Sequence, residues 1–155
     1  MTADALPMQP RKIVQPLIGV QEVSLTIAQG VFIMTAETML AEQKIVVARK
    51  GVSALAEAEL QVLGRQVPDW KVTNVDGMAQ LQHTYLTADF AQALQFANQI
   101  GALAEEVNHH PALLIEWGKL TVSWWTHTVR GLHLNDFIMA ARCDVELVSG
   151  NGGNG

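Results

Sequence analysis

The stretch EEVNHHPALLIEWGKLTVSWWTHTVRGLHLND, residues 105–136, decides both the fold and the chemistry that this chain can support. This stretch contains three histidines, His109, His110 and His127, within a span of 19 residues. Imidazole is the one side chain whose ordinary pKa lies close to neutral pH, so this spacing indicates proton chemistry. Pro111 biases the residue before it away from helical backbone angles. We therefore predict that a helix ends at the histidine pair and leaves both rings in a loop.

The residues that follow the histidine pair predict a β-hairpin, formed by residues 112–118 and 119–127, with a turn near Gly118 and Lys119. Successive side chains of a strand point to opposite faces of the sheet. The set that we expect to face the helices as core consists of Leu120, Val122 and Trp124. The opposite set consists of Thr121, Ser123, Trp125 and His127. An exposed tryptophan needs a reason, so Trp125 is expected to line a cleft or to lie against another subunit.

Ahead of this stretch, the sequence predicts a helix followed by a first β-hairpin. The run SALAEAELQVLGRQV is rich in strong helix formers, with Ser53 as its N-cap and Pro68 beyond its end. Residues 70–75 and 78–86 alternate in polarity on either side of an Asp-Gly pair, which favours a tight hairpin turn.

A longer helix is predicted from about residue 89 to about residue 106, because apolar side chains there follow the 3.6-residue period. The stripe that we expect to pack on the sheet consists of Phe90, Leu94, Ala97, Ile100, Leu103, Ala104 and Val107. Glu105 falls in the last turn, where the helix dipole disfavours a carboxylate. Glu105 is therefore either a solvated surface group or the partner of a nearby polar group.

A last helix is predicted to start near Leu134, with Asp136 at its third position. Free backbone N–H groups and the helix dipole favour a carboxylate there, and the same carboxylate could orient an imidazole. The predicted buried side of this helix consists of Phe137, Ile138, Ala140 and Ala141. Cys143, the single cysteine, is expected to be a small buried hydrophobe.

Together these elements predict an α+β fold, a two-layer domain in which three helices pack on one face of a four-stranded antiparallel sheet. The domain is expected to span residues 51–148, followed by a flexible glycine-rich tail, residues 149–155. Residues 1–50 are predicted to form a poorly ordered N-terminal extension. Met34 is a possible true start, so that the part before it would not belong to the native protein; the alternative is a genuine N-terminal arm.

The composition limits the classes of partner. The chain has 155 residues, of which 49% are apolar and 16% charged, as expected for a folded domain with a real core. The net charge is −5, and from Ser53 onward 11 acidic residues face 5 basic ones, which argues against a nucleic-acid-binding surface. No apolar run reaches the roughly 18 residues needed to cross a bilayer. We therefore expect a cytoplasmic protein with neither a nucleic-acid nor a membrane partner.

The polar positions of the central stretch form a recognisable pattern. The string ExxxHHP from Glu105 to Pro111, followed by His127 and Asp136, resembles the signature of the pterin-4a-carbinolamine dehydratases of bacterial type. The pattern THxxxGLxxxDF is also present and begins at Thr126. Five polar positions at their expected spacing make this a specific resemblance.

The resemblance covers about residues 53–145 and departs from the family pattern at two positions. Leu113 stands where many relatives have a tryptophan, which puts any role of that aromatic ring in doubt. His133 stands where the family usually has a threonine that caps the last helix, which weakens the expected cap.

The resemblance implies a reaction. Hydroxylation of aromatic amino acids such as phenylalanine leaves tetrahydrobiopterin as a 4a-hydroxy compound, a carbinolamine. The family dehydrates it to the quinonoid dihydropterin and water, and so recycles the cofactor of the hydroxylase. The departing hydroxyl group needs a proton, and N5 must lose one. Two histidines with pKa values near neutrality suit that exchange, one as acid and one as base.

The resemblance also suggests a role for each site residue. We expect His110 and His127 to form the acid–base pair, His109 to hold the pterin, and Asp136 to orient a ring. The expected catalytic residues are His110, His127, His109 and Asp136. The expected substrate-binding residues are Glu105, His109 and Trp125. Which imidazole acts as acid and which as base stays open at this point.

No metal and no cofactor are expected, because the pterin is the substrate. Adjacent histidines on extended backbone point apart, and the sequence has no HExxH motif. The resemblance implies a homodimer or a homotetramer, with an aromatic amino-acid hydroxylase as functional partner. Two alternatives remain open: a protein-interaction or dimerisation module that acts as a transcriptional coactivator, and a non-catalytic pterin-binding protein. Retention of all five polar positions favours catalysis over a pure interaction module.

Overall fold

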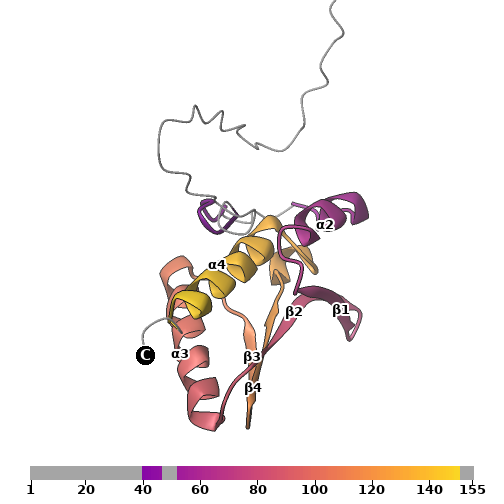
Figure 1. The fold of residues 1–155 in the computed structure, drawn as a ribbon. Helices are drawn as coiled ribbons and strands as arrows, with labels where there is room; N and C mark the ends of the chain where they lie inside the picture. The colour runs from indigo at the N-terminus through magenta and orange to yellow at the C-terminus, as the bar shows by residue number, and fades with distance from the viewer. Residues whose placement is uncertain (1–39, 47–51, 151–155) are drawn as a thin grey trace, which may run out of the picture. The chain divides into compact units, whose positions relative to one another are not determined.

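The computed structural model describes residues 40–46 and 52–150 (Figure 1). Every described residue belongs to one unit, Ile33–Gly155. The described elements are α2 (Glu57–Gly64), β1 (Lys71–Val75), β2 (Met78–Leu86), α3 (Phe90–Val107), β3 (Ala112–Glu116), β4 (Lys119–Trp124), the 3₁₀ turn η1 (His127–Val129) and α4 (Leu134–Gly150).

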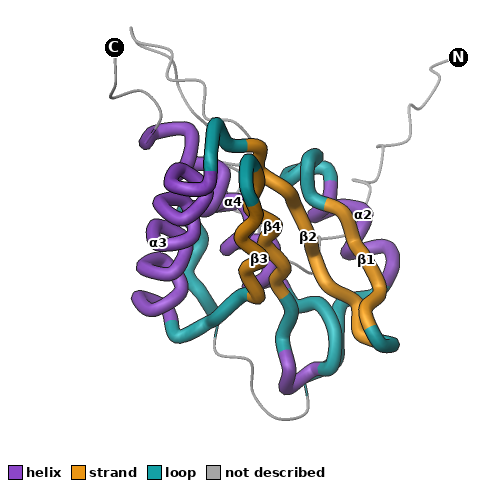
Figure 2. Tube along the Cα trace, turned by 90° about the horizontal axis from the view of Figure 1, so that it is seen from below, coloured by secondary structure: helices purple, strands orange, loops and turns teal. Residues whose placement is uncertain are grey.

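The four strands form one antiparallel sheet in the order β1–β2–β4–β3, as Figure 2 shows. In the register of the sheet, Leu81 of β2 lies opposite Trp124 of β4, and Leu113 of β3 lies opposite Val122. Helices α3 and α4 pack against the same face of this sheet. The predicted α+β fold, with three helices and a four-stranded antiparallel sheet, is confirmed.

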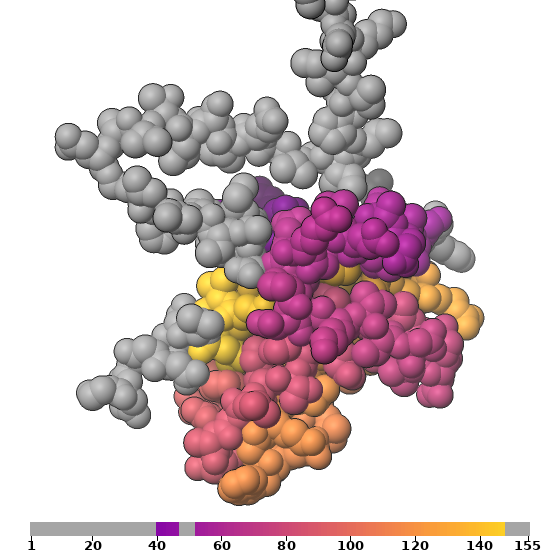
Figure 3. All heavy atoms as spheres, turned by 45° about the vertical axis from the view of Figure 1, so that its right-hand side comes forward, coloured from indigo at the N-terminus to yellow at the C-terminus, as the bar shows by residue number. Residues whose placement is uncertain are grey.

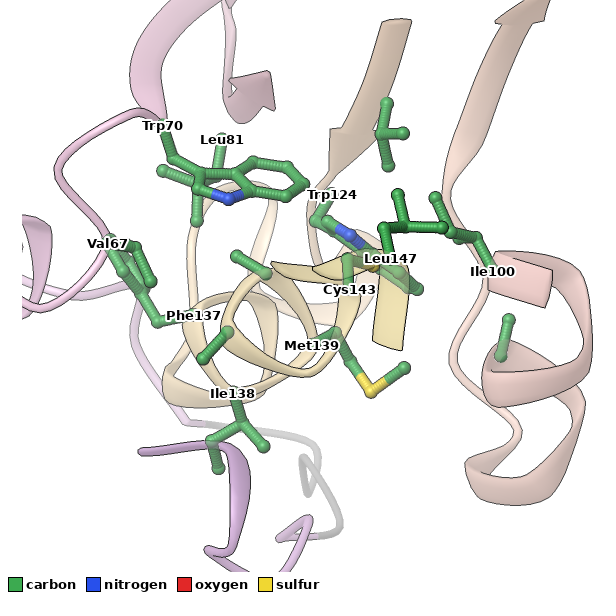
Figure 4. Close-up of a cluster of buried hydrophobic side chains, with 14 of the residues drawn as sticks. Val67, Trp70, Leu81, Ile100, Trp124, Phe137, Ile138, Met139, Cys143 and Leu147 are labelled. Atoms are coloured by element: carbon green, nitrogen blue, oxygen red, sulfur yellow. The ribbon is translucent and has the colours of Figure 1, made fainter. Parts of the chain in front are cut away.

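The hydrophobic core lies between this face of the sheet and the helices. Figure 4 shows side chains from both layers in one cluster, among them Trp124 of β4 and Phe137 of α4, both fully buried. The predicted inward face of β4 is confirmed, because its three members are all buried. Cys143 is buried and free, as expected. The core therefore fixes β4 against α4, the two elements on either side of the η1 loop.

The predicted start of the first helix is wrong. Helix α2 begins at Glu57, and its N-cap is Ala56 rather than the predicted Ser53. The backbone N–H of Leu55 instead donates to the carbonyl oxygen of Leu132 at 2.9 Å. This segment is therefore tied to the loop before α4, and that tertiary contact overrides the helix propensity of the run.

The predicted stripe of α3 is also partly wrong, because Phe90 and Leu94 remain 48% and 43% exposed. The buried residues are Ala93, Phe96, Ala97, Ile100 and Ala104. Apolar residues occupy more than one face in the first half of this helix, so the 3.6-residue period alone could not select the stripe that is buried.

Of the predicted N-terminal extension, residues 1–50, the structure describes only residues 40–46; Met34 lies outside the described residues. At the other end, α4 continues to Gly150, two residues into the predicted tail, and residues 151–155 also lie outside the described part.

Residues 40–46 are tied to α4. Leu40 is fully buried in the core. The side chain of Asn135 accepts a hydrogen bond from the backbone N–H of Val46 at 3.0 Å and donates one to its carbonyl oxygen at 2.6 Å. The guanidinium of Arg142 donates to the carbonyl oxygens of Ala41 and Gln43, each at 2.9 Å. The first turns of α4 are therefore held from outside as well as by the sheet.

Candidate active site

The loop after α3 brings His109 to the first turn of α4. Helix α3 ends at Val107, and Asn108 adopts a left-handed conformation with φ of 52°, which turns the chain away from the helix axis. Nε2 of His109 then lies 2.7 Å from Oδ1 of Asp136. The carboxylate oxygen accepts, so Nε2 carries the proton. The prediction that the helix ends just before the histidine pair is confirmed.

Asp136 is fully buried and accepts hydrogen bonds from three donors. Besides His109, the hydroxyl of Thr126 lies 3.2 Å from Oδ1 and 3.0 Å from Oδ2. The backbone N–H of His133 donates to Oδ2 at 2.7 Å. A buried charge is costly unless it is hydrogen-bonded. The carboxylate therefore accepts a backbone hydrogen bond at the N-terminus of α4 and binds the imidazole of His109 at the same time.

The ring of His109 is fixed on its flat side as well as at Nε2. It stacks on Trp124, with 5.2 Å between ring centroids and 28° between the planes. Because Trp124 is fully buried, the imidazole lies against the edge of the core. The side chain of His109 still keeps 15% of its surface exposed. The ring is thus oriented by the core and by a carboxylate while it remains open to the surface.

His110 is oriented by Glu105, the carboxylate in the last turn of α3. Nε2 of His110 lies 3.1 Å from Oε1 of Glu105, and the two side chains are 51% and 80% exposed. An ion pair this exposed contributes little to stability. The pair instead orients the ring. Nε2–H of His110 donates to the glutamate, and Nδ1 of His110 has no hydrogen bond to any described residue.

His127 lies in a loop, so the predicted strand 119–127 is too long. Strand β4 ends at Trp124, and His127 opens η1. The backbone N–H of Thr126 donates to the carbonyl oxygen of Gly131 at 2.9 Å, and this isolated bridge closes the loop. Gly131 suits the closure, because a Cβ there would lie 3.1 Å from Cβ of Ala54. His127 therefore lies in this closed loop and not on the face of β4 that it was predicted to share with Thr121 and Ser123.

Trp125 is the direct partner of His127. Its indole N–H donates to Nδ1 of His127 at 3.4 Å, and the two rings meet with centroids 5.1 Å apart at 66°. Since Nδ1 accepts this bond, Nε2 carries the proton of the neutral ring. His127 is exposed, so its Nε2 edge is open to a ligand.

The structure thus groups the predicted residues in three pairs: His109 with Asp136, His110 with Glu105, and Trp125 with His127. Within the described residues, no hydrogen bond joins one pair directly to another. Thr126 provides the connection, because its hydroxyl binds Asp136 and the next residue is His127. One buried carboxylate therefore orients His109 and anchors the loop that carries His127.

Two residues of this network were missed or undervalued in the sequence. Thr126 was not among the predicted site residues, although its place directly before His127 is a signal in the sequence for such a role. His133 was expected to be a weak cap, yet its Nδ1 accepts a hydrogen bond from the backbone N–H of Asn135 at 3.3 Å. Burial lowers the pKa of His133; the charge of Asp136 opposes this shift, and His109 adds to it.

A second carboxylate on α4 lies apart from these pairs. Asp144 accepts hydrogen bonds from the indole N–H of Trp70 at 2.9 Å and from the hydroxyl of Tyr85 at 2.5 Å. Burial raises the pKa of Asp144, and the bonds from Tyr85 and Trp70 act in the opposite direction. Its partners come from β2 and from the segment before β1, and neither belongs to the three pairs.

Other binding features of the described residues are few. No group of three His, Cys, Asp or Glu side chains in residues 40–46 and 52–150 is placed to hold a metal ion. A shallow hollow of about 520 Å³ on the outer face of α3 contains none of the predicted site residues. In the same part of the chain, no helix is long and apolar enough to cross a membrane.

Comparison with known proteins identifies the family to which this chain is similar. Residues 53–145 match the family model described as Pterin 4 alpha carbinolamine dehydratase. A Syntrophotalea carbinolica protein named "Putative pterin-4-alpha-carbinolamine dehydratase" is 45% identical over 108 residues, which cover 70% of this chain and 96% of that protein. A Microcystis aeruginosa protein of the same name is 50% identical over 107 residues, with coverage of 69% and 92%.

A solved structure shares the fold. The crystal structure described as a transcriptional coactivator/pterin dehydratase from Brucella melitensis superposes with a TM-score of 0.54 at 27% sequence identity. The match covers 60% of this chain and 97% of that chain.

Proposed function

Since the chain belongs to the pterin-4a-carbinolamine dehydratase family of hydro-lyases, we propose that it converts 4a-hydroxytetrahydrobiopterin to the quinonoid dihydropterin and water by histidine acid–base catalysis. One observation carries the proposal. His110 and His127 are both exposed, and a polar neighbour occupies one ring nitrogen of each, so the other nitrogen is available for proton transfer.

The hydrogen bonds suggest which imidazole plays which part. His110 donates from Nε2 to Glu105, so its Nδ1 can accept a proton, and the glutamate stabilises the resulting imidazolium. His127 accepts at Nδ1 from Trp125, so its Nε2–H can donate. We assign His110 as general base toward N5 of the pterin and His127 as general acid toward the 4a-hydroxyl.

The reaction balances with these two groups alone. The C4a–O bond breaks, the proton from His127 leaves with the hydroxyl as water, and His110 takes the N5 proton. The electron pair of the N5–H bond forms the double bond between N5 and C4a. No electrons are gained or lost overall, so the step needs no oxidant or reductant. His109 would hold the pterin from its place beside Asp136, and Trp125 would add an aromatic face.

We expect wild-type protein to accelerate decay of the 4a-carbinolamine generated by a coupled hydroxylase. His110→Ala and His127→Ala should each lose about tenfold or more of this acceleration, since a positioned proton carrier contributes about 10²–10⁴-fold in rate. Absorbance of the carbinolamine measures the decay. His83→Ala is the matched control, because His83 lies on β2 and binds the carbonyl oxygen of Asp69 at 2.9 Å. Folded wild type without acceleration would overturn the proposal.

The physiological setting that we propose is the recycling of a tetrahydropterin after each turnover of an aromatic amino-acid hydroxylase. The carbinolamine is the product of that hydroxylation, so the hydroxylase supplies the substrate.

We also propose that the protein works as a homodimer built through strand β3. This strand lies at the edge of the sheet, and its outer side pairs with no other described strand. Leu114 at its centre is 57% exposed, and Trp117 in the following turn is 76% exposed. Figure 3 shows the orange residues of this hairpin projecting at the lower end of the described part. A second copy fits because antiparallel pairing of identical edges is self-complementary.

Light scattering coupled to size exclusion tests this dimer. Leu114→Lys is expected to halve the wild-type mass or to weaken association at low protein concentration, because it places a charge at the centre of the shared edge. Val72→Lys is the matched control on the opposite edge strand, where Val72 is 48% exposed. A wild-type monomer, or equal loss of mass in both variants, would rule out pairing through β3.

A further inference from the structure

Helix α4 begins with a histidine cap. His133 precedes the first helical residue, and its Nδ1 accepts a hydrogen bond from the backbone N–H of Asn135 at 3.3 Å. In return, the backbone N–H of His133 donates to Oδ2 of Asp136 at 2.7 Å. The arrangement differs from a capping box, in which both bonds join the cap residue to the third residue of the helix. Here His133 accepts from Asn135, the second residue of α4, and donates to Asp136, the third. An imidazole nitrogen here accepts the backbone hydrogen bond that a serine, threonine, asparagine or aspartate oxygen usually accepts at a helix N-cap.

The cap works in only one protonation state. A backbone N–H can only donate, so Nδ1 of His133 must carry a lone pair, and the proton of the neutral ring lies on Nε2. His133 is only 9% exposed, and this burial lowers its pKa. The titratable groups that act on it are Asp136, on the same helix, and His109, from the loop after α3. The charge of Asp136 raises the pKa of His133, and His109 lowers it.

The same carboxylate joins the cap to the proposed site. Oδ2 of Asp136 is bound to the cap residue, and Oδ1 is bound to Nε2 of His109 at 2.7 Å. A shift of the first turn of α4 would therefore move both oxygens. Misplacement of a site group by about 1 Å can cost on the order of 10²-fold in rate.

We propose that His133 is a positioning residue whose neutral imidazole caps α4 and thereby holds the Asp136 carboxylate against His109. The activity part of this inference rests on the proposed dehydratase function; the structural part does not. A protonated ring would direct Nδ1–H at the N–H of Asn135, donor against donor, so the cap is lost on acidification.

The sign of the pH effect follows from the lowered pKa. The unfolded chain, in which a histidine has a pKa of about 6.5, binds a proton more readily than the folded protein does. Stability then rises with pH. The contribution of His133 is fully present above the unfolded pKa and is lost as the pH falls through the folded pKa.

Three variants separate positioning from simple loss of a cap. His133→Ala removes the cap, and His133→Asn replaces it with an oxygen acceptor that does not titrate near neutrality. Asp89→Ala is the matched control, because Asp89 caps α3 by accepting from the N–H of Gln92 at 2.8 Å. We expect His133→Ala to lower kcat at pH 8 on the order of tenfold, His133→Asn to stay near wild type, and Asp89→Ala to lower the urea midpoint with kcat unchanged. Wild-type kcat in His133→Ala would overturn the proposal.

Two readouts do not need activity, so they still decide the structural part if the dehydratase proposal fails. Long-range ¹H–¹⁵N spectra should show His133 protonated at Nε2 alone at pH 8, and the His109 Nε2–H signal should shift in His133→Ala but not in His133→Asn. Between pH 8 and pH 5 the urea midpoint should fall more in wild type than in His133→Asn. A proton on Nδ1 of His133 in the neutral ring, or equal falls in midpoint, would refute the cap.

Discussion

Asp136→Ala is expected to lower kcat/KM about 100-fold and the free energy of unfolding by about 3–5 kcal/mol. The substitution leaves the N–H of His133, the hydroxyl of Thr126 and Nε2–H of His109 without their acceptor at a buried site. Each buried donor without a partner costs about 1–3 kcal/mol. Urea denaturation and the carbinolamine decay assay measure the two losses separately.

Asp136→Asn separates the chemistry from the stability. The amide keeps one oxygen but turns its NH₂ group toward a donor and removes the negative charge beside His109. We expect this variant to fold more stably than Asp136→Ala while it still loses tenfold or more in kcat/KM, because an orienting carboxylate also fixes the tautomer of its imidazole (roughly 10–100-fold for comparable supporting groups).

Asp144→Asn is the matched control on the same helix. Asp144 is a partly buried carboxylate that accepts from two donors, Trp70 and Tyr85, but it belongs to none of the three site pairs. We expect its kcat/KM to remain at the wild-type value. A loss equal to that of Asp136→Asn would mean that the substitutions act by disturbing α4 as a whole.

The histidine loop was predictable because its cause is local. Pro111 restricts the backbone of the residue before it, and the helix does end three residues before His110, at Val107. The alternating pattern of β4 likewise predicted its buried face, because strand geometry has a fixed period of two residues. The fold class followed from these local signals.

The failures have a common physical cause, which is tertiary contact. The end of β4 depends on the bridge between Thr126 and Gly131, which no period in the sequence encodes. The start of α2 depends on the hydrogen bond from Leu55 to Leu132, a residue far from it in the sequence. The role of Thr126 depends on a carboxylate ten residues away. Sequence reasoning could propose the five polar positions of the site but not the network that joins them.

Substitutions of the adjacent residues Trp124 and Trp125 should have opposite effects: the first should lower stability, and the second should change the kinetics. Trp124→Ala is expected to lower the free energy of unfolding by about 3–5 kcal/mol, the usual cost of removing a buried aromatic side chain. Trp124 is fully buried and supports the ring of His109 by stacking. Circular dichroism during urea denaturation measures this loss without relying on tryptophan fluorescence.

Trp125→Ala should behave in the opposite way. Trp125 is half-buried, and its hydrogen bond is to Nδ1 of His127. We expect a change in stability below about 1 kcal/mol, a higher KM for the carbinolamine, and a shifted pH profile of kcat, because His127 loses the donor that fixes its tautomer. Unchanged kinetics in Trp125→Ala, or destabilisation equal to that of Trp124→Ala, would contradict the assignment. If both expected results are obtained, Trp124 at the end of β4 supports the fold and the next residue, Trp125, serves the pterin. A shift of one position in the sequence would then exchange a loss of stability for a loss of binding.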